Sequence, residues 1–160
     1  MARATFVKKA RKDIPNTDIK AGDSYYWWAF MSGGRGGPKR YSKTRPRASQ
    51  LTQSEFLSEI YAAQELLDAA SDADSTIAAL EDARSAVESA KDNCEDKLSN
   101  MPDSLQQGTT GQLLQDRIDN CERIISEIDD CIGAVEELKE HPDDDSLDNI
   151  MSGTIDWSVE

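Results

Sequence analysis

The sequence of 160 residues has few of the side chains from which metal and catalytic sites are built. It contains one histidine, His141, and three cysteines, Cys94, Cys121 and Cys131. None of them stands in a CxxC or HxxxH spacing, so the pattern of a zinc site is missing. No motif gathers titratable groups in a context that would form a catalytic pocket. We therefore expect a protein that is not an enzyme and that uses no metal or other cofactor.

Long apolar runs are missing as well. No stretch approaches the ~20 consecutive apolar residues that are needed to cross a bilayer. The basic N-terminus, residues 1–15, is not followed by an apolar segment and so does not have the form of a secretory signal. We expect a soluble cytoplasmic protein with reduced thiols and no membrane partner.

Charge is abundant, and its two signs are separated along the chain. Residues 1–50 contain twelve basic and three acidic side chains, a net charge of +9. Residues 51–160 contain six basic and 28 acidic side chains, a net charge of −22. Such a division is typical of a basic segment that binds a polyanion, or of one that associates with the acidic part of its own chain. The charges alone allow both.

Apolar residues in the acidic part recur at helical spacing in two arms. The first arm contains Ile77, Leu80, Ala83, Val87, Ala90, Cys94, Leu98 and Met101, and the second contains Leu114, Ile118, Cys121, Ile125, Ile128, Ile132, Val135 and Leu138. Steps of three and four keep these side chains on one stripe of a helix. If the chain folds back between the two arms, the numbers of opposite residues should add to a constant. They add to 215 for every pair, as for Cys94 and Cys121, except for Leu98 and Ile118. This predicts an antiparallel coiled-coil hairpin with helices at about 50–101 and 112–140.

The first of these helices contains one weak point. Ser49 or Thr52 is expected to cap its N-terminus, and the apolar stripe continues from there without a change of phase. Residues 71–75 are serine and aspartate apart from one alanine, and these side chains favour caps over helix interiors. The helix is therefore continuous or broken at residues 71–75.

The beginning of this helix also carries apolar residues that the shorter second helix does not reach. The tail, residues 142–160, predicts a short helix at Ser146–Gly153 and contains an aromatic residue beyond it. Tail and head are both candidates to cover the uncovered residues. We expect a partner-binding surface there, made by Phe56, Ile60, Tyr61 and Trp157.

Residues 1–48 form a basic head that is predicted to be rich in β-structure. Strands are expected near Phe6, over residues 24–31 and over residues 39–43, with a glycine-rich connection at residues 32–38. In an extended chain Tyr26 and Trp28 share the core face. We therefore expect an α+β, mostly α protein with a β-rich head (1–48), a long helical hairpin (49–141) and an acidic tail (142–160).

The segment Ile19–Trp28 resembles the I-x-x-G-[DE]-x-Y-Y-x-W segment of small treble-clef fingers, the poly(ADP-ribose) polymerase type among them. Residues 1–56 also resemble the N-terminal part of uncharacterised small phage proteins. In the fingers a zinc knuckle precedes the segment. This chain has no cysteine before Cys94 and holds Asp-Ile-Pro-Asn-Thr-Asp at residues 13–18 instead. The resemblance thus implies a metal-free relative of the finger.

The head combines cations with aromatic residues, as in proteins that hold single-stranded nucleic acid by phosphate contacts and base stacking. Tyr25 and Trp27, on the face away from the expected core, are predicted to stack on bases or to pack on the first helix. The residues predicted to contact nucleic acid are Lys8, Lys9, Arg11, Lys12, Tyr25, Trp27, Arg35, Lys39, Arg40 and Lys43.

Three functions are compatible with this organisation. The first is a phage-encoded protein that is active in the host cytoplasm as a nucleic-acid-associated binding or adaptor protein. Its head would contact nucleic acid, and its acidic hairpin would contact protein. The second is an acidic inhibitor of a basic host protein that binds nucleic acid or acts in defence, working by DNA mimicry or by plugging a groove. The third is a structural coiled-coil assembly protein. We expect a monomer or a weak homo-oligomer.

Overall fold

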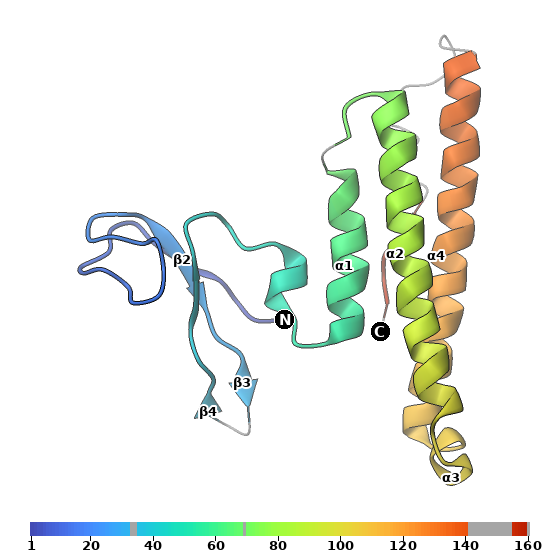
Figure 1. The fold of residues 1–160 in the computed structure, drawn as a ribbon, viewed down its shortest axis with the longest axis horizontal. Coiled ribbons are helices and arrows are strands. Elements are labelled where there is room, and N and C mark those ends of the chain that lie inside the picture. Colours follow the sequence, from blue (N-terminus) through green and yellow to red (C-terminus); the bar gives the residue numbers. More distant parts are fainter. Residues whose placement is uncertain (33–34, 69, 141–154, 160) are drawn as a thin grey trace. The chain divides into compact units, whose positions relative to one another are not determined.

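The computed structural model describes residues 1–32, 35–68, 70–140 and 155–159. It divides into two compact units, Met1–Ser58 (unit 1) and Glu59–Glu160 (unit 2). Unit 1 contains a small antiparallel sheet, and unit 2 contains long helices that pack against one another (Figure 1). The protein is therefore α+β and mostly α, as the sequence predicts.

The sheet of unit 1 has three antiparallel strands. β2 (Tyr25–Trp28) lies between β1 (Thr5–Val7) and β5 (Arg40–Ser42). Phe6 is opposite Tyr26, and Trp27 is opposite Tyr41. A separate short hairpin pairs β3 (Met31–Ser32) with β4 (Arg35–Gly36). Strands thus form where aromatic and β-branched residues favour them.

The core of unit 1 is centred on Trp28. Its side chain is 4% exposed, and its indole Nε1 donates a hydrogen bond to the carbonyl of Gln50 at 3.2 Å. Gln50 belongs to a short 3₁₀ helix, η1 (Ala48–Leu51), that follows the sheet. Burial of an indole with its N–H paired is the arrangement that anchors a small core. The predicted core role of Trp28 is confirmed.

The loop between β1 and β2 is fixed by hydrogen bonds. The amide of Ala10 donates to the carbonyl of Asp23 at 2.7 Å, and the amide of Gly22 donates to the carbonyl of Ala10 at 2.9 Å. Gly22 has φ +101°, which only glycine adopts readily. Ile19 is buried beneath the loop. Among the described residues no group of His, Cys, Asp or Glu side chains could hold a metal ion.

Unit 2 contains an antiparallel hairpin of α2 (Ala73–Ser99) and α4 (Thr109–Glu140), joined through the short α3 (Asp103–Gln106). Ion pairs cross from α2 to α4, among them Arg84–Asp129 at 2.8 Å, Lys91–Glu122 at 2.9 Å, and Asp74–Lys139. The residue numbers of each of these pairs add to 213. One register therefore holds along the whole hairpin, close to the one that the sequence predicts.

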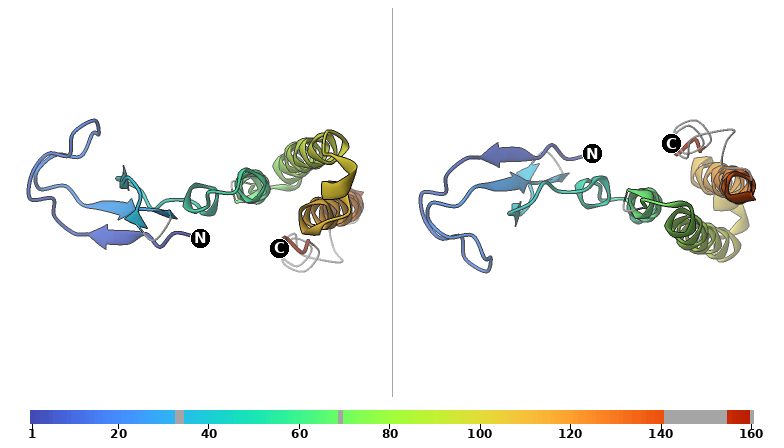
Figure 2. Two further views of the ribbon diagram at one scale, coloured as in Figure 1. Left: turned by 90° about the horizontal axis from the view of Figure 1, so that it is seen from below. Right: turned by 90° about the horizontal axis from the view of Figure 1, so that it is seen from above.

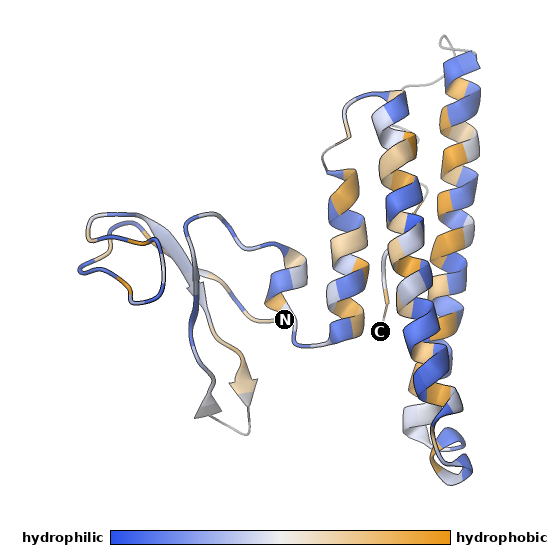
Figure 3. Ribbon diagram, viewed as in Figure 1, coloured by the Kyte–Doolittle hydropathy of each residue, from blue (hydrophilic) through white to orange (hydrophobic). Residues whose placement is uncertain are grey.

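The buried stripe of α4 differs from the predicted seam at two places. Ile124 and Cys131 are fully buried, whereas Ile125 and Ile132, which the heptad pattern assigned to the seam, are half-buried. The reason is a third helix, α1 (Glu55–Leu67), whose part after Ser58 belongs to unit 2. Seen end-on in Figure 2, α1 lies beside the hairpin of α2 and α4, so the hairpin buries a broader face than a two-helix seam requires. Figure 3 shows the apolar residues of these helices.

The predicted helix over residues 50–101 is two helices. α1 ends at Leu67 and α2 begins at Ala73, where Asp72 caps the new helix: its carboxylate accepts from the amide of Ser75 at 2.9 Å, and the hydroxyl of Ser75 accepts from the amide of Asp72 at 3.1 Å. α1 begins at Glu55. Its N-terminus is capped by Ser54, not by Ser49 or Thr52: the hydroxyl of Ser54 accepts a hydrogen bond from the amide of Leu57 at 3.3 Å.

The break places α1 antiparallel to α2 (Figure 1). Ile60 is 0% exposed and Phe56 is 4% exposed. These two residues are therefore not on the surface, where the sequence predicted a partner-binding role for them.

One sequence prediction falls outside the described residues, the short helix at residues 146–153. Within the described part of the chain, none of the helices combines the length and the apolar character that a bilayer crossing demands.

Candidate nucleic-acid interface

A cleft of about 420 Å³ on unit 1 is lined by residues of β1, β2, β5 and the loop after β1. Three predicted cations line it, Lys9, Arg11 and Lys12, together with the predicted stacking residue Tyr25. The rest of its wall contains Tyr41 and apolar groups from the loop after β1. The structure thus brings four of the ten predicted nucleic-acid residues into one concave surface.

The cations reach the cleft because Ala10 is fixed. Ala10 is 4% exposed and is held to the chain at Gly22 and Asp23 by the two amide hydrogen bonds described above. Its neighbours Lys9 and Arg11 are exposed, as is Lys12. A buried alanine inside a basic run therefore directs positive side chains outward on a rigid stretch of backbone.

The aromatic wall is a pair of tyrosines. Tyr25 on β2 and Tyr41 on β5 have ring centroids 6.1 Å apart, and their planes are inclined by 52°. Both residues are half-buried, so each keeps an accessible part. Aromatic faces beside lysine and arginine can stack on a base while the cations meet the phosphates.

Asp13 is the one acidic residue in the cleft wall. Its carboxylate accepts a hydrogen bond from the amide of Ala21 at 2.8 Å and lies 3.8 Å from the ammonium of Lys20. Its charge is therefore used to hold the loop and is partly neutralised.

Trp27 does not line the cleft and has a cation over its ring. The ammonium of Lys39 lies 4.3 Å from the ring centroid of Trp27, and the guanidinium of Arg40 lies 5.0 Å from that of Phe30. Such contacts place both cations on the sheet but occupy part of each aromatic face. A base stacking on Trp27 would have to displace Lys39.

Lys43 is engaged in an ion pair. Its ammonium lies 2.9 Å from the carboxylate of Asp23, and this hydrogen bond, followed by one from the amide of Lys20, holds the pKa of Asp23 below its usual range. Lys43 is thus a weaker phosphate ligand than its sequence position suggests. Lys8 is exposed outside the cleft, and the side chain of Arg35 lies outside the described residues.

No family model matches this chain, and no curated protein or solved structure is similar to it. Assignment of a function therefore depends on the chemistry of the surfaces themselves.

The residue that the sequence analysis missed is Tyr41. It is brought to Tyr25 by the pairing of β5 with β2, which places residue 41 opposite residue 27. Period-two alternation could have put Tyr41 on the face of Tyr25 and Trp27 once this register was assumed.

The cysteines offer no reactive site. Cys94, Cys121 and Cys131 are buried thiols. Burial, followed by the neighbouring Cys94, raises the pKa of Cys121 to about 12, and burial raises the pKa of the other two thiols. Because the thiolate is the nucleophile, these groups are unreactive in the folded protein.

Proposed function

We propose that unit 1 binds single-stranded nucleic acid through the cleft at Tyr25 and Tyr41, and that the protein acts as a nucleic-acid-associated adaptor. The observation that supports this is the convergence of Lys9, Arg11 and Lys12 on the tyrosine pair. Phosphates would meet the three cations, and one base would stack on the exposed part of the tyrosines.

The opposite charges of the two units are compatible with such binding. The chain as a whole carries a net charge of −13, which repels a polyanion at long range. At 0.1 M salt the Debye length is about 10 Å, so charges farther than this from a bound phosphate are largely screened. We therefore expect the affinity for nucleic acid to fall clearly at high salt. At very low salt we expect little or no gain in affinity, because the net charge of the chain then repels nucleic acid over a longer range.

The test is fluorescence anisotropy of a labelled single-stranded DNA of about twelve nucleotides, a length within the range covered by such domains. The full chain is compared with the triple variant Lys9→Gln, Arg11→Gln, Lys12→Gln. The matched control is Arg3→Gln, Lys8→Gln, Arg45→Gln, which removes the same charge from residues of unit 1 that do not line the cleft.

We expect the cleft variant to weaken binding about tenfold or more and to flatten its salt dependence, as loss of two or three phosphate contacts does. Tyr25→Leu should weaken it further by roughly the 1–3 kcal/mol of one stacked base. Equal losses in the two triple variants would show that only total charge matters and would overturn the assignment of the cleft.

Unit 2 supports the second candidate, an acidic protein that occupies the groove of a nucleic-acid-binding partner. Residues 59–160 carry 27 acidic and six basic side chains. Under that function the full chain would compete with DNA for a basic protein, and the cleft variant of unit 1 would compete as well as the wild type. Adaptor function predicts instead that the cleft variant loses the DNA-bound complex.

A further inference from the structure

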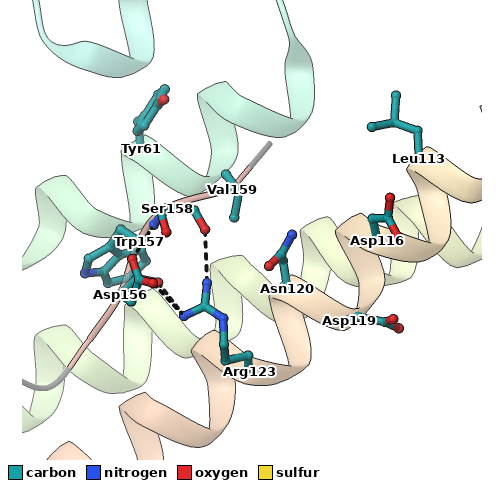
Figure 4. A pocket seen from close by; sticks show the side chains of 10 residues that line it. All are labelled: Tyr61, Leu113, Asp116, Asp119, Asn120, Arg123, Asp156, Trp157, Ser158 and Val159. Carbon is teal, nitrogen blue, oxygen red and sulfur yellow. Dashed lines mark hydrogen bonds and ion pairs between the residues drawn. The ribbon is translucent and has the colours of Figure 1, made fainter.

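The C-terminal segment Ile155–Val159 runs along a second cleft, of about 850 Å³, in unit 2. Tyr61 of α1, residues of α4 from Leu113 to Arg123, and Trp157 of the segment all line this cleft (Figure 4). Two of the four predicted partner-binding residues, Tyr61 and Trp157, thus meet here.

The segment is held by its backbone. Arg123 donates from Nη1 to the carbonyl of Asp156 at 2.8 Å and from Nη2 to the carbonyl of Ser158 at 3.0 Å. Glu127 accepts from the amide of Asp156 at 2.7 Å. Main-chain groups of residues i and i+2 lie on the same edge of an extended chain. Arg123 and Glu127 therefore recognise one edge of an extended peptide, and another peptide in this conformation would make the same contacts.

Arg123 and Glu127 are prepared for this role by their spacing. They are one turn apart on α4, and Nη1 of Arg123 lies 3.0 Å from a carboxylate oxygen of Glu127. The carboxylate of Asp156 lies 3.6 Å from Nη1 of Arg123. This site therefore favours an acidic residue, and in this chain the half-buried Trp157 follows it.

The cleft continues past Val159 towards the N-terminal part of α4. Figure 4 shows Asn120, Asp116 and Leu113 in succession on that side. Leu113 precedes Arg123 by ten residues, which is ~15 Å along a helix and room for roughly four extended residues. Carboxylates in this stretch favour a cation, whereas the residue that follows Val159 in this chain is the acidic Glu160. The chain's own segment is thus an imperfect match for the whole cleft.

We propose that this cleft is a peptide-binding groove for a partner protein, and that its ligand is an extended segment with an acidic, an aromatic, a small and an aliphatic residue followed by basic residues. Ile155–Val159 occupies the groove as an intramolecular ligand, and a partner segment with the added basic residues displaces it. The proposal concerns unit 2 alone and does not depend on nucleic-acid binding by unit 1.

The test uses the full chain and labelled peptides in an anisotropy titration. The ligand peptide is Ile-Asp-Trp-Ser-Val-Lys-Lys, and its comparisons are Ile-Asp-Trp-Ser-Val-Glu-Glu and a scrambled form of the lysine peptide. Because a tethered segment competes at an effective concentration on the order of millimolar, each peptide is also titrated into Trp157→Ala, whose own segment is weakened. We expect the lysine peptide to bind this variant about tenfold more tightly than it binds the wild type.

Three further variants in the Trp157→Ala background locate the site. Arg123→Ala should weaken binding of the lysine peptide about tenfold or more. The control Arg84→Ala replaces an arginine on α2 and should leave the affinity unchanged. Asp116→Asn with Asp119→Asn should remove most of the preference for the lysine over the glutamate peptide. The proposal is overturned if Trp157→Ala shows no saturable binding, if the scrambled peptide binds equally well, or if Arg123→Ala and Arg84→Ala behave alike.

Discussion

Asp23 determines how many cations of unit 1 are free to meet a ligand. Its carboxylate holds Lys43 at 2.9 Å and also accepts from the amide of Lys20 at 3.1 Å. These contacts stabilise the loop before β2 and use one positive charge. Because they favour the ionised form, their contribution is present above the ordinary pKa of an aspartate and is lost as the pH falls through the lowered value.

Asp23→Asn is predicted to raise the affinity of unit 1 for single-stranded DNA. The amide keeps the shape of the side chain but releases Lys43, so roughly a threefold gain is expected, the scale of one exposed ion contact. Anisotropy titrations at two salt concentrations measure it. Asp18→Asn, which removes an exposed charge of the same sign, is the control for the change in net charge. A gain of equal size in the control would contradict the role of Lys43.

Cys121 is predicted to make the protein less stable at alkaline pH. Its pKa is raised from 9.0 to about 12 by burial. Below pH 9 the thiol is neutral in both states and has no effect. Above it the unfolded chain ionises first, so the free energy of unfolding falls by about 1.4 kcal/mol per pH unit.

Denaturant titrations between pH 8 and pH 10.5 test this by comparing the wild type with Cys121→Ala. The variant should show a shallower decline, whatever its stability at pH 8. Parallel declines would show that Cys121 ionises in the folded protein as readily as in the unfolded one.

At the level of the elements, the join between α3 and α4 depends on Gly111. A β-carbon at this buried position would overlap the carbonyl oxygen of Gln106, whereas one at Gly133 in the middle of α4 would meet no atom within 4 Å. The same replacement thus has opposite consequences at two glycines of one helix. At Gly111 a steric clash determines the effect of the replacement on stability. At Gly133 the loss of backbone entropy of the unfolded chain determines it.

Gly111→Ala is predicted to destabilise the protein by about 1–3 kcal/mol, the cost of overpacking a site that cannot expand. Gly133→Ala is its matched counterpart and should stabilise by about 1 kcal/mol, the difference in helix propensity. Chemical denaturation measures both. Equal signs for the two variants would contradict the contact between α3 and α4.

The sequence predicted the elements where the signal is local or strictly periodic. Heptads and the constant total of facing numbers located α2 and α4 and their register, and aromatic content located β2. Burial of Ile124 in place of Ile125 could not be read from the pattern, because it arises from α1 packing on the hairpin. The cleft in unit 1 could not be read from the sequence either. Tyr41 reaches Tyr25 through the register of β5 on β2, and the glycine-rich connection between these strands does not determine that register.

At the scale of the molecule, the interruption after Leu67 decides how the apolar residues of α1 are covered. One helix over residues 50–101 would hold Ile60 and Ala63 away from the hairpin, whereas the break lets α1 reverse and bury both residues completely. Unit 2 thereby buries an apolar surface that would otherwise have to be covered by another protein. A coiled-coil assembly function loses its main motivation, since the stripe is already covered.

Removal of the break is predicted to open unit 2. Ser71→Ala, Asp72→Ala and Ser75→Ala together delete the cap of α2 and supply residues that favour a continuous helix. We expect a larger hydrodynamic radius and concentration-dependent association in sedimentation velocity, because Ile60 and Ala63 become exposed. Ser85→Ala, Ser89→Ala and Asp92→Ala make the same change of composition within α2 and should leave a compact monomer. Identical sedimentation of the two triple variants would contradict this account.

The antiparallel hairpin also has a mechanical consequence. The start of α2 and the end of α4 lie at the same end of the hairpin, where Asp74 meets Lys139, and α3 closes the opposite end. A force applied through the flanking chain would therefore peel the helices apart from the open end, one pair of contacts after another, and would not shear the whole seam at once. A tension that reaches it through Val159 must first release the backbone contacts of Arg123, so the groove would be emptied before the hairpin opens.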